Sequence, residues 1–167
     1  MKRAHVAWLI GALALATLMF APAAQAASAK RPSTSCSFTF KATFDPPLQQ
    51  GMNRGAFFTW DASLDGCTGG KVASGSGYGG SLGDLQCDGG TLRGRSSAKM
   101  QVYWDNGKDS GINFRFDFTR SRFGGKVLGD YLQGERVRAK NVTFTPVQGD
   151  CASSPLATAE ITGTVGL

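Results

Sequence analysis

The stretch INFRFDFTR, residues 112–120, decides the fold class of this chain. Its apolar residues, Ile112, Phe114, Phe116 and Phe118, alternate with polar ones and therefore fall on one face of an extended strand. The same two-residue period recurs from residue 38 to residue 167, and no sustained 3.6-residue apolar period accompanies it there. The pattern predicts an all-β domain in which residues 112–120 form a core strand with one face in water.

About nine short strands are expected, at residues 36–44, 56–64, 71–76, 91–95, 99–104, 112–120, 126–132, 138–145 and 161–167. A single sheet would leave its phenylalanine face wet, so the fold is an antiparallel β-sandwich or a closed β-barrel, and the pattern leaves both open. Residues 66–94 hold 11 glycines in 29 positions. We expect ordered strands and turns in this segment, packed less well than the rest.

One connection carries a strong hairpin signal, because Asn106-Gly107 lies between two alternating runs. A two-residue loop would place Gln101 opposite Ile112 and would mix the two faces. A register that pairs Val102 with Ile112 keeps the apolar side chains together. The sequence therefore predicts a loop of odd length or a bulge at this hairpin.

The first residues have the features of a secretory signal. Lys2 and Arg3 precede an apolar run over residues 7–21, and Ala24 and Ala26 form the small-x-small pattern of a cleavage site. The run is shorter than the roughly 20 residues that span a bilayer, so no transmembrane segment is predicted. We expect a signal peptide at 1–26, a disordered mature N-terminus at 27–35 and one all-β domain at 36–167. The product would be secreted or extracellular, with association to the cell envelope a further option.

The four cysteines, Cys36, Cys67, Cys87 and Cys151, indicate two disulfides in an exported chain. No two of them show the short spacing of a four-cysteine zinc site. Three connectivities are open. Cys36 and Cys67 lie almost symmetrically about a turn candidate at residues 51–55, which favours the pairs Cys36–Cys67 and Cys87–Cys151.

Charge is concentrated in one part of the chain. Removing Lys2 and Arg3 from the 18 basic residues leaves 16 against 12 acidic ones, a net charge of about +4. Seven basic and three acidic residues between 115 and 140 account for the whole surplus. On outward positions of neighbouring strands they would form a basic patch for an anionic envelope polymer or a membrane surface. The alternative is a solvated face. The predicted binding residues are Arg115, Arg120, Arg122, Arg136 and Arg138. Nucleic acid is not predicted as a partner, because no recognition motif accompanies the charge.

Several catalytic classes are excluded by composition. His5 is the only histidine and lies in the predicted signal peptide, so histidine-dependent triads and most zinc sites have no imidazole. We predict no cofactor, no metal and no assigned catalytic residue, and hence a non-enzymatic binding or surface-interaction protein. The alternative is a glycoside hydrolase, which needs two carboxylates across a cleft. Its candidates are Glu135, Glu160, Asp105, Asp109 and Asp117, and Tyr78 and Tyr103 are candidates for stacking on sugar rings.

A wider likeness rests on three stretches and two further cysteines. CSFTFKATFDPPL at 36–48, CTGGKVASGSG at 67–77 and TAEITGTVGL at 158–167, with Cys87 and Cys151, resemble small exported β-rich proteins of uncharacterised function that recur in actinobacteria. The resemblance implies a disulfide-bonded exported β domain and supplies no catalytic or binding residues. The many arginines between 115 and 138 depart from that group's threonine- and glycine-rich character.

Overall fold

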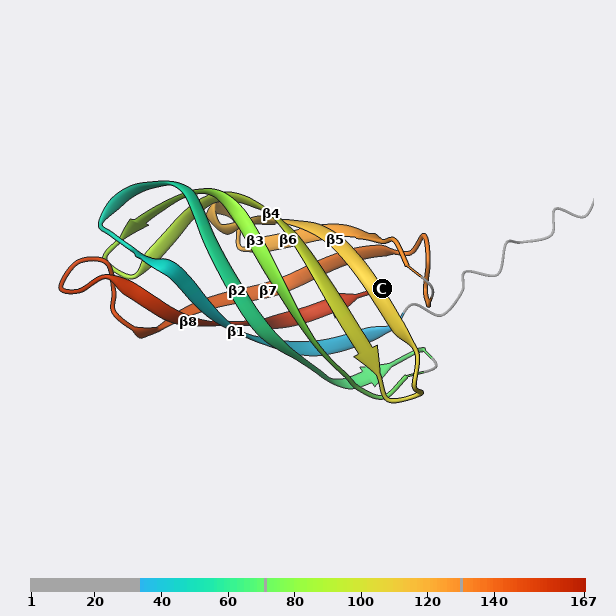
Figure 1. The fold of residues 1–167 in the computed structure, drawn as a ribbon. Coiled ribbons are helices and arrows are strands. Elements are labelled where there is room, and N and C mark those ends of the chain that lie inside the picture. The colour runs from blue at the N-terminus through green and yellow to red at the C-terminus, as the bar shows by residue number, and fades with distance from the viewer. Residues whose placement is uncertain (1–33, 71, 130) are drawn as a thin grey trace, which may run out of the picture.

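The computed structural model describes residues 34–70, 72–129 and 131–167, and Figure 1 shows their fold. The predicted signal peptide and most of the predicted disordered N-terminus lie outside these residues, and the first strand begins at Ser35. The elements are β1 (Ser35–Leu48), β2 (Gly51–Thr68), β3 (Gly75–Asp88), β4 (Thr91–Trp104), β5 (Asp109–Asp117), the 3-10 helix η1 (Phe118–Arg120), β6 (Arg122–Val127), β7 (Arg136–Gln148) and β8 (Leu156–Gly166). In this part of the chain, no helix has the length and apolar character needed to cross a membrane.

The eight strands form one closed antiparallel barrel. Each strand pairs with its successor, and β8 pairs with β1 along most of the length of both strands. Closure pairs the first strand with the last, so neither of them is a free sheet edge, and it removes the need for a second sheet to cover the apolar face. The all-β prediction is confirmed, and of its two architectures the structure has the barrel.

The barrel interior is filled by aromatic and aliphatic side chains. Phe40, for example, stacks on Trp60 with ring centroids 5.7 Å apart and lies 5.8 Å from Phe123. An eight-stranded barrel has an interior just wide enough for such packing, because inward positions alternate with outward ones along every strand. The predicted core positions Ile112, Phe114 and Phe116 are buried. Phe118 is only partly buried, because β5 ends at Asp117 and Phe118 belongs to η1.

The glycine-rich segment forms an ordered strand, β3, although the strand lies later than the predicted residues 71–76. Its inward positions include Gly75, Gly77 and Gly79. A Cβ atom at Gly79 would lie 2.6 Å from Trp60 Cε2, and one at Gly75 would lie 2.9 Å from Trp104 Cε3. These glycines therefore give two large indole rings room against the barrel wall.

Two further boundaries differ from prediction. Residues 91–95 and 99–104 belong to one strand, β4, because buried Ser96 and Ala98 continue the alternation between them. The predicted strand at 126–132 is wrong in its bounds, since β6 runs from Arg122 to Val127. Beyond Val127 the Leu128 amide donates to the Gly111 carbonyl at 2.8 Å, and the chain turns away toward β7. The barrel consequently has eight strands.

The hairpin between β4 and β5 has the predicted odd loop. Residues 105–107 form the loop, Gly107 has a φ of +76°, and the Trp104 amide donates to the Lys108 carbonyl at 2.8 Å. The predicted pairing of Val102 with Ile112 is wrong by two residues, because Met100 pairs with Ile112. A shift of two positions preserves which side chains face inward, so the parity argument led to the right faces but not to the right register.

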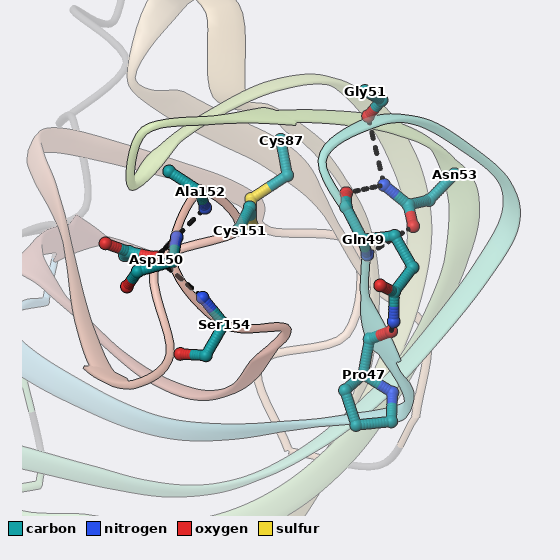
Figure 2. The surroundings of a disulfide bond; sticks show 10 residues. Pro47, Gln49, Gly51, Asn53, Cys87, Asp150, Cys151, Ala152 and Ser154 are labelled. Atoms are coloured by element: carbon teal, nitrogen blue, oxygen red, sulfur yellow. Dashed lines mark hydrogen bonds between the residues drawn. A yellow bond between two sulfur atoms is a disulfide. The ribbon is translucent and has the colours of Figure 1, made fainter.

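Both predicted disulfides are present. Cys36–Cys67 joins β1 to β2, and Cys87–Cys151 joins the end of β3 to the loop between β7 and β8. Figure 2 shows the second bridge beside the turn that links β1 to β2. The Asp150 carboxylate there accepts hydrogen bonds from the amides of Ala152, Ser153 and Ser154, which lower the pKa of Asp150. The loop that carries Cys151 is thus ordered by its own backbone.

The ladder between β6 and β7 is the shortest in the described part of the barrel. Its registered pairs are Gly124 with Arg138, Gly125 with Val137 and Lys126 with Arg136. On the hairpin side the Val127 amide still donates to the Glu135 carbonyl at 3.0 Å, whereas no registered pair between the described residues of β6 and β7 lies beyond Gly124 and Arg138. Outward basic side chains flank the seam. This β6–β7 seam lies beside the site described next.

Candidate functional site: an arginine depression on the barrel wall

Strand register brings charged residues from distant parts of the sequence into one row on the outer wall. Arg95 of β4 pairs with Asp117 of β5, and Asp117 pairs with Arg122 of β6. The one-turn helix η1 then places Arg120 on the same carboxylate. Antiparallel neighbours on one face lie about 5 Å apart, so these side chains must interact.

Asp117 is the centre of this group. Its Oδ2 atom lies 3.3 Å from Arg95 Nε, 3.3 Å from Arg120 Nη1 and 3.9 Å from Arg122 Nη2. Asp117 occupies an outward position, yet it is only 9% exposed, and the buried Oδ1 atom has no hydrogen-bond partner among the described residues. The three guanidinium groups are themselves more than half exposed. One carboxylate therefore fixes three arginines while leaving their outer surfaces to solvent.

These residues line a hollow of about 500 Å³, which we call the arginine depression. Its floor includes Phe123, Gly124 and Ala139, and its cationic side chains are Arg95, Arg115, Arg120, Arg122, Arg138 and Lys140. Six cations around one carboxylate give the depression a local charge of about +5. Arg115, Arg138 and Lys140 form no ion pair with any described residue, so their charges are available to a ligand.

Four of the five predicted binding residues meet in this depression. Arg136 does not line it, because it pairs with Lys126 one row further along the wall. Arg95 was missed by sequence reasoning, which looked for charge between residues 115 and 140. Had residues 91–104 been recognised as one strand hairpinned to β5, the alternation would have placed Arg95 on the same face as Asp117 and Arg115.

The carboxylates considered for hydrolysis are scattered. Glu160 lies on β8 opposite Lys41 and Thr145, and Glu135 lies in the turn that leads into β7. Asp105 and Asp109 lie at the β4–β5 hairpin, where they accept hydrogen bonds from the Ala73 amide and from Gln101 Nε2.

One pair of carboxylates does share a hollow, of about 480 Å³, at the edge of the arginine depression. It contains Asp84 and Asp117, together with Arg95 and Arg120. Asp84 Oδ1 accepts from the Gly55 amide at 2.9 Å, and Asp117 accepts from the arginines. Both carboxylates thus accept hydrogen bonds from protein donors, and Asp117 holds cationic side chains in place.

Over residues 34–70, 72–129 and 131–167, no three side chains of His, Cys, Asp or Glu come together in a way that could hold a metal ion. The side chains that converge on the outer wall are guanidinium and ammonium groups, which bind anions.

The chain was also compared with known proteins. No family model, no curated protein and no solved structure matched it. The function is therefore inferred from the geometry and charge of the depression.

Proposed function

We propose that this protein is a non-enzymatic binding protein that holds an anionic polymer of the cell envelope in the arginine depression. The observation that carries the proposal is the convergence of six cationic side chains from β4, β5, η1, β6 and β7 on one hollow with a single carboxylate. Like charges gathered in this way repel one another, and a bound polyanion relieves the repulsion. Arginine suits the task, because its planar guanidinium donates two parallel hydrogen bonds to a carboxylate or phosphate.

Export is part of the same proposal. The basic and apolar N-terminal residues have the pattern of a signal peptide. Two disulfides are typical of proteins that fold in an oxidising compartment. Both features support a protein that works outside the cytoplasm, where anionic envelope polymers are found.

A polymer fits the depression better than a membrane surface does. Proteins that lie on membranes insert protruding apolar side chains between the headgroups. The apolar residues of the depression, Phe123 and Ala139, are buried in its floor, and its rim is cationic. A flexible anionic chain can enter a concave cationic hollow, whereas a flat bilayer reaches only its rim.

The test is binding of the mature protein to immobilised polygalacturonate, to polyphosphate and to phosphatidylglycerol vesicles, at low and high salt. We expect retention on at least one polymer, weakening as salt rises because screening shortens electrostatic reach to about 8 Å at physiological ionic strength. The double variant Arg122→Gln/Arg138→Gln should weaken this binding by about tenfold, equivalent to about 1.4 kcal/mol.

Matched control variants distinguish binding in the depression from a general effect of the protein's net charge. Lys41→Gln/Arg54→Gln removes the same two charges from exposed strand positions outside the depression and should change the affinity less than about twofold. Arg136→Gln should have a similarly small effect. Equal losses in both double variants, or retention on vesicles alone, would refute the proposal.

A further inference from the structure

The arginine depression continues along the barrel wall into two adjoining hollows. A hollow of about 730 Å³ shares Arg115 and Gly124 with the depression. A second adjoining hollow shares Gly80, Lys99 and Asn113 with the 730 Å³ hollow. It extends to Tyr78, Gln101 and Leu128. We call these two adjoining hollows the wall trough. The strands that carry it, β2 to β6, are successive neighbours in the barrel (Figure 1).

The trough exists because small residues occupy outward positions on adjacent strands. Gly80 pairs with Lys99, and Ser97 pairs with Arg115, which in turn pairs with Gly124. A Cβ atom at Gly80 would lie 3.5 Å from Phe57 Cε2 and 3.7 Å from the Phe58 carbonyl oxygen, which are ordinary van der Waals distances. Packing therefore does not require glycine at this position. The absence of a side chain at Gly80 leaves the trough floor open.

Apolar side chains stand along the trough and remain exposed. Phe57 is 44% exposed, Leu82 is 58% exposed and Tyr78 is 57% exposed. Tyr78 lies beside Tyr103, with ring centroids 6.3 Å apart, and this neighbour raises the pKa of the Tyr103 hydroxyl. The exposed rings of Phe57 and Tyr78, beside a glycine in the trough floor, offer flat apolar surfaces to a ligand.

Polar groups line the side of the trough that β4, β5 and β6 form. Lys99, Arg115 and Lys126 supply positive charge, while Asn113 and Ser97 supply uncharged donors and acceptors. A ligand that suits the whole trough therefore has flat apolar faces, hydroxyl groups and negative charges within one chain. A chain of acidic pyranose rings has all three, whereas polyphosphate has only the charge.

The combined length of the arginine depression and the wall trough also favours a polymer as the ligand. On β4, Arg95 lines the arginine depression and Gln101 lines the far hollow of the trough, six residues away. Strands rise about 3.3 Å per residue, so the depression and the trough together are about 20 Å long. A single sugar unit would cover only a part of this length.

From these features we infer that the wall trough and the arginine depression together bind an extended strand of acidic polysaccharide. This inference rests on the proposed function and specifies its ligand class. The depression would hold carboxylates of the strand, and the exposed rings would lie against its sugar faces.

The test fills the trough without touching a charge. Gly80→Val places a β-branched side chain on the trough floor, at a position where Cβ makes only ordinary contacts. We expect affinity for oligogalacturonate of more than about six units to fall about tenfold, with polyphosphate binding unchanged within about twofold. The control is Ser63→Val, which places the same valine side chain at an outward β2 position away from the trough. Circular dichroism and urea unfolding of both variants confirm that the barrel is intact.

The outcomes separate the two proposals. If Arg122→Gln/Arg138→Gln weakens oligogalacturonate binding and Gly80→Val does not, the trough inference is overturned and the proposed function stands. If Gly80→Val weakens polyphosphate and oligogalacturonate equally, the inference is likewise overturned, because the trough would then not read sugar rings. If neither variant affects binding, both proposals fail. A Gly80→Val variant that does not fold is replaced by Phe57→Ala, for which the same selective loss is expected.

Discussion

Gly79 and Gly80 are adjacent in β3, and we predict that the same substitution at the two positions has opposite effects on stability. Gly79 faces the core and Gly80 faces solvent. In Gly79→Ala the new methyl group would lie 2.6 Å from Trp60 Cε2 and 2.6 Å from the Lys99 carbonyl oxygen. Carbon atoms in contact normally lie about 3.5 to 4.0 Å apart, so the indole or the strand must move by about 1 Å.

Neither neighbour can move freely. The Lys99 oxygen belongs to the backbone of β4, which pairs with β3 along its whole length. The Trp60 ring lies among four phenylalanine rings, with centroids between 5.5 and 5.8 Å away. Overpacking a core typically costs about 1 to 3 kcal/mol, and two rigid neighbours place this site toward the upper end. Replacing glycine also lowers the conformational entropy of the unfolded chain, which stabilises the folded state by about 0.4 to 1 kcal/mol. The net destabilisation is about 2 kcal/mol.

Gly80→Ala meets no such obstacle and should stabilise the protein by about 0.5 kcal/mol through the same entropy effect. Urea unfolding followed by tryptophan fluorescence measures both variants. With a denaturant slope of about 1 to 3 kcal/mol per molar, the two midpoints should differ by about 1 to 2 M. Equal midpoints, or a lower midpoint for Gly80→Ala, would show that β3 does not face the core as described.

Four further outcomes are expected. Arg95→Gln should weaken polyanion binding about threefold or more while changing the unfolding free energy by less than about 1 kcal/mol, because the Arg95 side chain is largely exposed and Asp117 keeps its ion pair with Arg120; isothermal titration and urea unfolding check this. Replacing Cys87 and Cys151 by serine should destabilise the protein by about 0.6 kcal/mol more than replacing Cys36 and Cys67, because the bridges span 64 and 31 residues and loop entropy grows with length; a reversed order in thermal unfolding would contradict this. The lowered pKa of Asp150 means that its hydrogen bonds stabilise the loop above the ordinary value of 3.8 and are lost as pH falls through the lowered pKa; amide exchange at residues 152–154 should quicken there, and in Asp150→Ala it should be fast at every pH. Oligogalacturonate affinity should rise with chain length until the ligand spans about 20 Å and then level off, which titration with defined lengths measures.

The fold class was predictable because its physical signal is local. Alternation in residues 112–120 identifies buried positions without any knowledge of the neighbouring strands, and the parity argument at Asn106-Gly107 required an odd loop. Closure into a barrel was not predictable in this way, since it depends on β8 meeting β1 across the whole chain. β3 was misplaced because most of its inward positions are glycines, which carry no hydrophobic signal although the packing of Trp60 and Trp104 depends on two of them.

The candidate site was predictable only in part, for a similar reason. Arg115, Arg120, Arg122 and Arg138 are close in sequence, so their charge stands out in the composition of one segment. Arg95 joins them through the register of a hairpin, which sequence gives with an uncertainty of two residues, as the Met100–Ile112 pair shows. The trough was invisible to sequence analysis, because Gly80 and Gly124 form it by lacking side chains.

The β6–β7 seam has a consequence for the barrel as a whole. With three registered pairs it is the place where the wall has least backbone bonding. Arg138 of β7 pairs with Gly124 of β6, and Arg122 lies two residues before Gly124, so one arginine from each strand lines the depression. An anion bound by both arginines would link β6 to β7, two strands that few backbone hydrogen bonds join. Ligand binding would then stabilise the barrel wall against local opening at this seam. Slower amide hydrogen exchange in β6 would measure the effect without any label on the ligand.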